Sequence, residues 1–346
     1  MHQLIVRDDN FPKNPKKAIE NGIAESERMF LAWAHEQSRP EEDFIERSGT
    51  CAIIVLIVGD ICYVANVGDS RAIMSVDGGE KILLLSKDHK PEDDGETKRV
   101  EENGGQIYQN KSYVPDPSPE NASGVQMIIG PHRVFPGRLS VSRTIGDIEA
   151  KDPRYGGNPM CVIPTPDIKC FKIRNNYDFI VLGCDGVFEK LDNKAVINAS
   201  WDAAMCDYEN DEVIRKNIDK NVIKNGGPIS IHQKSGLAVD KILHECVFAK
   251  TLDNITAVMI AFENFENLAT TEVHSKADEN STQEHYKLMQ QRKSLEPVLE
   301  EFIESEADTP VNFPNVIPKD GKYSAKSPRS NDKQRASAKL EGTGNQ

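Results

Sequence analysis

A helical repeat of apolar residues lies near the start of the chain. Four apolar residues, Ile19, Ile23, Phe30 and Ala34, recur at intervals of four and seven positions, the spacing of one face of an α-helix. Asn14 and Pro15 stand before the repeat as an N-cap residue and a proline at the first helical position. The pattern predicts an amphipathic helix over 16–37.

From Ser48 the pattern changes to short apolar runs divided by Gly and Asp. Three of these runs predict strands, Ala52–Ile57, Cys62–Val67 and Ala72–Val76. Because the turns between them are tight, we expect an antiparallel meander. Ala52–Ile57 is apolar throughout, which favours a central strand that is covered on both faces.

The following segments alternate between strand and helix patterns. Short apolar runs predict strands over Val125–Ile129, Leu139–Val141, Ile168–Ile173, Phe179–Leu182 and Ile255–Phe262, with the third and fourth paired as a hairpin. Helical patterns cover Asp94–Asn103, Asn193–Met205, Asp211–Val222 and Gly236–Ala249, the last capped by Ser235. The polar, proline-containing stretch Tyr108–Gly124 predicts a surface loop. Strands and helices in separate blocks indicate an α+β fold.

After Phe262 the composition changes. Residues 263–346 are poor in aromatic residues and rich in Glu, Ser, Asn and Lys, which is typical of a disordered tail. A helix is expected within it over 284–304. The sequence thus predicts one domain over 1–262 and a tail over 263–346.

The net charge, the apolar runs and the cysteines of the sequence exclude several classes of protein. The 346 residues carry a formal net charge of −13, which argues against binding to nucleic acid or to anionic membranes. The longest apolar run, Cys51–Val58, is far shorter than the roughly 20 residues of a membrane-spanning helix. The 7 cysteines form no C-x-x-C pair. We therefore expect a protein of the cytoplasm or nucleus with reduced thiols.

Three acidic turns lie at strand ends and are candidates for metal binding. Asp69, Asp185 and Asp253 each stand beside Gly or Asn next to an apolar run. Such an Asp is often a turn residue that binds its own backbone. Clustered carboxylates, however, are the ligands of hard divalent cations, and a pair of such cations can activate water against phosphorus.

Longer residue strings carry a family resemblance. In chain order they are Ser48-Gly49-Thr50, Ala65-Asn66-Val67-Gly68-Asp69-Ser70-Arg71, Asp88-His89-Lys90-Pro91, Glu102-Asn103-Gly104-Gly105, Leu139-Ser140-Val141-Ser142-Arg143-Thr144-Ile145-Gly146-Asp147, Cys184-Asp185-Gly186-Val187-Phe188 and Leu252-Asp253-Asn254-Ile255-Thr256. Together, over about residues 4–262, they resemble the metal-dependent protein serine/threonine phosphatases of the PPM family, protein phosphatase type 2C.

The resemblance implies a fold and a metal site. The family fold is a two-layer antiparallel β-sandwich flanked by helices. By analogy Asp185 and Asp253 bind one metal of a pair, and Asp69 helps to bind a third, weaker metal together with Glu189, where Asp is the usual residue. The implied cofactor is Mg²⁺ or Mn²⁺, and the implied partner of this monomer is a phosphorylated protein. Arg143, Asp147 and His89 are interpreted as structural.

One family string does not occur in the sequence. Family members carry an upstream Asp-Gly-His-Gly-Gly string whose Asp bridges both metals, and this sequence contains no such string. We expect the first strands and that segment to be missing, with weak metal binding and little hydrolysis by this chain. Two hypotheses follow: a metal-dependent phosphatase for phosphoserine and phosphothreonine, or a catalytically inactive pseudophosphatase that binds phosphoproteins or another partner.

Overall fold

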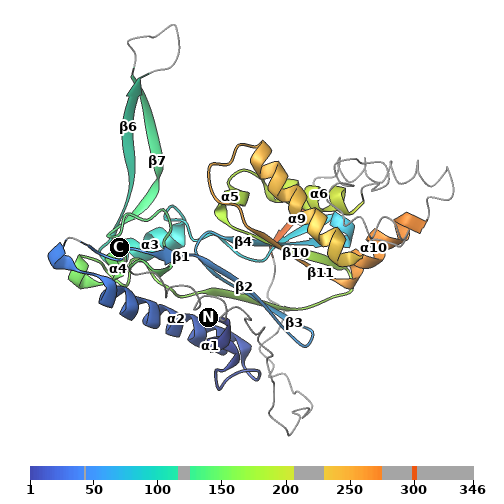
Figure 1. Cartoon of the computed structure of the whole chain (residues 1–346), viewed down its shortest axis with the longest axis horizontal. Coiled ribbons are helices and arrows are strands. Elements are labelled where there is room, and N and C mark those ends of the chain that lie inside the picture. The colour runs from blue at the N-terminus through green and yellow to red at the C-terminus, as the bar shows by residue number, and fades with distance from the viewer. Residues whose placement is uncertain (43, 116–124, 206–229, 275–297, 302–346) are drawn as a thin grey trace, which may run out of the picture. The chain divides into compact units, whose positions relative to one another are not determined.

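The computed structural model describes residues 1–42, 44–115, 125–205, 230–274 and 298–301 (Figure 1). The described helices include α1 (His2–Val6), α2 (Pro15–Gln37), α3 (Asp94–Glu102), α4 (Ile148–Lys151), α5 (Asp185–Phe188), α6 (Asn193–Ala204), α9 (Ile231–Phe248) and α10 (Glu263–His274). The described strands are β1 (Gly49–Thr50), β2 (Ala52–Val58), β3 (Ile61–Val67), β4 (Arg71–Val76), β5 (Lys81–Leu84), β6 (Gln106–Pro115), β7 (Val125–Phe135), β8 (Ile145–Gly146), β9 (Asp167–Lys172), β10 (Tyr177–Gly183), β11 (Ala257–Ala261) and β12 (Val298–Glu301).

Two sheets form the centre of the fold. One has the strand order β2-β3-β9, and the other has the order β11-β10-β4-β5-β12. The pairs are antiparallel except for β5 with β12. The fold is therefore α+β with antiparallel sheets, as the sequence predicts.

Alternating side chains of the strands divide the core into layers. In β10, Ile180 and Leu182 pack in a cluster with Cys62 and Val64 of the other sheet, whereas Phe179 and Val181 pack in the cluster that includes α6 and α9. On the outer face of the three-stranded sheet, a third cluster contains residues of α1 and α2. The two sheets thus lie face to face with helices outside each of them.

The structure corrects the predicted strand pairing. β4 does not continue a meander with β2 and β3 but joins the five-stranded sheet. β9 pairs with β3, and β10 pairs with β4 and β11, so the predicted hairpin of 168–173 with 179–182 is wrong. Each of these connections crosses from one sheet to the other. Within the described residues β2 pairs with β3 alone, which makes it an edge strand rather than a central one.

Several local predictions also change. The expected loop over 108–124 is in its described part the strand β6, which pairs with β7. Residues 139–141 form no strand. Helix α9 starts five residues earlier than predicted, at Ile231, because Ser230 and Gln233 form a capping box, so Ser235 lies inside the helix and is not its cap. The helix predicted over 211–222 lies outside the described residues.

The packed core continues beyond Phe262. Phe265 of α10 is fully buried against Phe179 and Trp201. Val298–Glu301, inside the helix predicted over 284–304, form a strand that runs parallel to β5. The rest of the predicted tail lies outside the described residues.

Candidate metal centre

The strand register brings the three acidic turns to the same ends of neighbouring strands in the five-stranded sheet, where β10 finishes and β4 and β11 begin. Gly183, the last residue of β10, pairs with Arg71 at the start of β4 and with Ala257 at the start of β11. Asp185 follows Gly183 by two positions, and Asp69 precedes Arg71 by two. Because these strands are antiparallel, the end of β10 lies beside the starts of both neighbours.

The Asp185 turn is packed tightly against the Asp253 turn. A Cβ atom on Gly186 would lie 2.2 Å from the carbonyl oxygen of Asn254, so only glycine fits there. The Cys184 backbone N–H donates to the Thr256 carbonyl at 3.1 Å, and the Thr251 hydroxyl donates to the Gly186 carbonyl at 3.2 Å. These bonds hold the two turns together.

The Asp69 turn connects the two sheets. Gly68 has φ +105°, a left-handed conformation that favours glycine, and a Cβ atom there would lie 2.2 Å from Cys51 Sγ. The Asp69 side chain is buried and accepts a hydrogen bond from Cys51 Sγ at 3.3 Å. Burial and the neighbouring charge of Asp69 raise the pKa of the Cys51 thiol to about 12, so this thiol stays protonated.

Asp69, Asp185 and Glu189 line one cavity of about 390 Å³. Basic side chains, Arg71, Lys90 and His132, line it as well. Asp253 is not among the lining residues. Its turn packs against Gly186, the residue after Asp185. The structure therefore groups three of the four predicted ligands and places the fourth in the adjoining turn.

The carboxylates in and beside this cavity repel one another. Burial is the main cause that raises the pKa of Asp185, and the negative charges of Asp69 and Asp253 raise it further. A bound cation would relieve this repulsion. Among the described residues, no three His, Cys, Asp or Glu side chains are close enough to hold a metal ion. A magnesium-like ion that keeps several waters and uses one or two carboxylates nevertheless fits such a donor set.

Lys90 supplies a positive charge to Asp69, which sequence reasoning missed. Its Nζ donates to Asp69 Oδ2. Burial acts to lower the pKa of Lys90, but the hydrogen bond and charge of Asp69, with the charges of Asp88 and Glu189, raise it overall. Lys90 is therefore cationic at neutral pH and partly offsets the negative charge of the cavity.

Three consecutive side chains, Asp88, His89 and Lys90, hold the Asp69 turn. Asp88 accepts two hydrogen bonds from Arg71, at 3.0 and 2.8 Å, in a bidentate ion pair. The ring atom Nδ1 of His89 accepts from the Gly68 backbone N–H at 3.0 Å. The backbone N–H of His89 donates to the Gly68 carbonyl at 3.0 Å. The string Asp88-His89-Lys90-Pro91 thus fixes the backbone on both sides of Asp69.

The tautomer of His89 follows from its partners. Since Nδ1 accepts, the ring proton lies on Nε2, which faces Asp167 Oδ2 at 3.1 Å and donates to it. His89 is only 2% exposed and does not line the cavity. Its predicted structural role agrees with this geometry.

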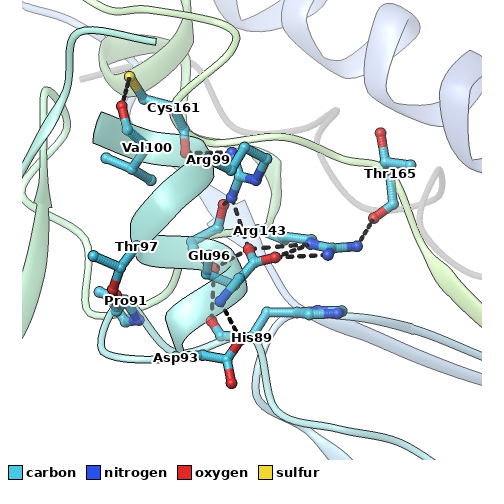
Figure 2. Close-up of polar contacts among 12 residues, drawn as sticks. His89, Pro91, Asp93, Glu96, Thr97, Arg99, Val100, Arg143, Cys161 and Thr165 are labelled. Atoms are coloured by element: carbon cyan, nitrogen blue, oxygen red, sulfur yellow. Dashed lines mark hydrogen bonds and ion pairs between the residues drawn. The ribbon is translucent and has the colours of Figure 1, made fainter. Parts of the chain in front are cut away.

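An ion-pair network centred on the buried Glu96 adjoins the exposed Asp167, and Figure 2 shows Glu96 with Arg99 and Arg143. Arg143 donates to Asp167 Oδ1 at 2.7 Å and to Glu96 Oε1 at 2.6 Å. Glu96 also accepts from Arg99 at 2.7 Å and from the Ser142 hydroxyl. Burial acts to raise the pKa of Glu96, but these hydrogen bonds outweigh it and lower that pKa to about 2. Arg143 is therefore structural, as predicted.

The Asp147 turn is joined to helix α2. Asp147 has φ 58°, and its backbone N–H donates to the Ser48 carbonyl at 2.9 Å. The neighbouring Gly146 N–H donates to Glu27 of α2 at 2.7 Å, and Glu27 pairs with the buried Lys151. Asp147 does not line the cavity, which agrees with the predicted structural role.

Comparison with known proteins identifies the family. The family model "Protein phosphatase 2C" matches residues 1–222. "Probable protein phosphatase 2C 5" of Paramecium tetraurelia is 32% identical over 200 residues, which cover 56% of this chain and 59% of that protein. "Probable protein phosphatase 2C 27" of Arabidopsis thaliana is 25% identical over 260 residues, covering 75% of this chain and 53% of that protein.

The fold has a counterpart among solved structures. A structure described as that of "a C.elegans sex determining protein" aligns with a TM-score of 0.51 and 18% identity, and the alignment covers 76% of this chain and 50% of that one. The chain belongs to the protein phosphatase 2C family. It spans between half and three fifths of the curated relatives named above. Among the described residues, no helix is both long and apolar enough to cross a membrane.

Proposed function

We propose that the chain forms part of a metal-dependent protein phosphatase site that hydrolyses phosphoserine and phosphothreonine. In this proposal Asp185 and Asp253 bind one metal of a pair, and Asp69 and Glu189 bind a third, weaker metal. The observation that supports it is the common cavity of Asp69, Asp185 and Glu189, in which the carboxylates repel one another. The membership of the family, which is metal-dependent, supports Mg²⁺ or Mn²⁺ as the cation.

The metal ions, when bound, supply Lewis acidity for activation of the attacking water. The chain's own residues position the carboxylates. The turns of Asp185 and Asp253 pack against each other at Gly186. The His89 ring accepts a hydrogen bond from Gly68 and so fixes the Asp69 turn. The cations on the cavity wall, Arg71 and Lys90, suit a negatively charged phosphoryl group.

A second candidate is a phosphoprotein-binding module without catalysis. The ion pair of Lys90 with Asp69 supports it, because the lysine already supplies a cation to one of the proposed ligands. In such a module Arg71 and Lys90 bind the phosphate, and no metal is required.

Phosphate release from phosphorylated casein distinguishes the two candidates. The full chain is assayed with millimolar MnCl₂ and with EDTA, beside Asp185→Asn and the control Asp240→Asn on helix α9. Turnover that needs Mn²⁺ and is lost only in Asp185→Asn supports the phosphatase. Binding of phosphorylated casein in EDTA that Lys90→Met abolishes and that Asp185→Asn leaves unchanged contradicts it and supports the module.

A further inference from the structure

The β6–β7 hairpin presents an apolar face that is covered by no other described element. These strands form a two-stranded sheet of their own. In Figure 1 they stand away from the two central sheets. A two-stranded hairpin has little intrinsic stability, so the side chains on its faces need a reason to be apolar.

The register places the apolar side chains on one face. Tyr113 lies opposite Met127, Pro115 opposite Val125 and Lys111 opposite Ile129. Directly opposed residues point to the same side of a sheet, and so do residues two apart on one strand. Tyr113, Val125, Met127 and Ile129 therefore form a continuous stripe, which we call the apolar stripe.

Each member of the apolar stripe is largely exposed. Tyr113 is 70% exposed, Val125 66%, Ile129 49% and Met127 46%. A cluster of this kind on a protruding element is characteristic of a surface that binds another polypeptide.

The charge of the hairpin differs from that of the whole chain. Strands β6 and β7 contain Lys111, His132 and Arg133 but no Asp or Glu, whereas the chain carries a net charge of −13. His132 has an acidic neighbour from outside the two strands, since Glu92 Oε2 lies 3.7 Å from His132 Nδ1. Asp116 and Glu120 in the connecting segment offset the charges of Lys111 and Arg133, so the hairpin as a whole has no excess of positive charge. Lys111, on the same face as Ile129, is the cation that suits an acidic residue of a partner.

The base of the hairpin reaches the candidate metal centre. Pro131 and His132 of β7 line the same cavity as Asp69 and Asp185. Five residues separate His132 from Met127, or about 17 Å along a strand. A polypeptide with one residue in the cavity therefore reaches the apolar stripe within about five residues.

We propose that the apolar stripe docks the phosphoprotein substrate on one side of its phosphorylated residue. Apolar side chains of the substrate pack on Tyr113, Met127 and Ile129, and its acidic residues face Lys111. The proposal rests on the proposed function for the phosphate in the cavity. It adds a preference for substrates that have apolar and acidic residues within about five positions of the phosphoresidue.

Two neighbouring isoleucines provide a matched test. Ile129 lies in the apolar stripe, whereas Ile128, also 49% exposed, points to the opposite face of the hairpin. Binding of fluorescently labelled phosphorylated casein to the full chain is measured by anisotropy for Ile129→Ser and Ile128→Ser. We expect Ile129→Ser to weaken binding by about fivefold or more and Ile128→Ser by less than about twofold.

The outcomes separate this proposal from the proposed function. Equal affinities of the two variants would overturn the docking surface, and so would a dimer of the chain that Ile129→Ser alone dissociates, since a second copy would then be the occupant. The binding comparison does not require turnover, so it decides the docking proposal even if the full chain releases no phosphate. With turnover, hydrolysis of p-nitrophenyl phosphate should be the same in both variants, because this small ester does not reach the stripe.

Discussion

At the scale of single residues, the geometry of the Asp69 turn depends on Gly68. The Gly68→Ala variant should lose about 2 kcal/mol or more of unfolding free energy, because a methyl group meets Cys51 Sγ in addition to the cost of a left-handed backbone. The control is Gly104→Ala, where φ is +79° and no atom lies within 4 Å of the added Cβ. Urea denaturation measures both, and equal losses would mean that backbone strain alone matters.

Glu96 connects stability to pH through the network around Arg143. Its pKa in the folded protein is about 2, below the ordinary value of 4.5 for a glutamate. The folded state therefore favours the ionised form, and the resulting stability is present above about pH 4.5 and is lost as the pH falls towards 2. Replacement of Glu96 by Gln should cost about 2–4 kcal/mol at pH 7, because Arg143 and Arg99 lose their common partner.

The matched control for Glu96 lies on the same helix. Glu101 of α3 is exposed, so Glu101→Gln should change the unfolding free energy by less than about 0.5 kcal/mol. Urea denaturation at pH 7 and at pH 3 tests the assignment. The difference between wild type and Glu96→Gln should shrink at pH 3, and a constant difference would assign the stability to packing instead of charge.

At the scale of elements, the segment with Asp88, His89 and Lys90 holds the β3–β4 turn in place. Removal of the Lys90 charge by Lys90→Met should destabilise the metal-free protein, because Asp69 is left buried without its partner. The same variant should gain more stability from Mn²⁺ than the wild type, since the cation then has no competitor for Asp69. Thermal denaturation with and without MnCl₂ measures both effects.

The control for this element is a lysine three positions earlier. Lys87 is exposed and pairs with Asp93, and it does not contact Asp69. Lys87→Met should leave the stabilisation by Mn²⁺ unchanged. If Lys90→Met gains no more from Mn²⁺ than Lys87→Met, Asp69 is not a ligand.

The periodicity of apolar residues predicts the bounds of elements but not the pairing of strands. Helix α2 and strands β2, β3, β4 and β10 match their predicted ranges closely, because their apolar spacing reports burial of one or both faces. Their partners do not follow from spacing. A run such as Ala72–Val76 is equally apolar in a meander or in a second sheet, and the crossing at Gly68 depends on its contact with Cys51.

At the scale of the whole molecule, the candidate site is a consequence of sheet register. The acidic turns were predictable as an Asp beside Gly or Asn at strand ends, and their convergence follows from the pairing of Gly183 with Arg71 and Ala257. The role of Lys90 was not predictable, because an ion pair between two distant loops leaves no periodic signal. The Glu96 network was missed for the same reason: its carboxylate and guanidinium groups come from α3 and from the segment before β8.

The folded core of the whole molecule includes helix α10. The sequence predicted its end at Phe262, but Phe265 is fully buried, with ring centroids 5.1 Å from Phe179 and 5.0 Å from Trp201. Phe265→Ala in the full chain should lose about 3–5 kcal/mol of unfolding free energy, because it opens a cavity and removes two edge-on aromatic contacts.

The control is Glu266→Ala, one exposed position further along α10, which should change the unfolding free energy by less than about 0.5 kcal/mol. Urea denaturation monitored by Trp fluorescence reports the loss where it occurs, since Trp201 is one of the contacting rings. A small effect of Phe265→Ala would restore the predicted end of the core at Phe262 and would make α10 an accessory to a domain that is stable without it.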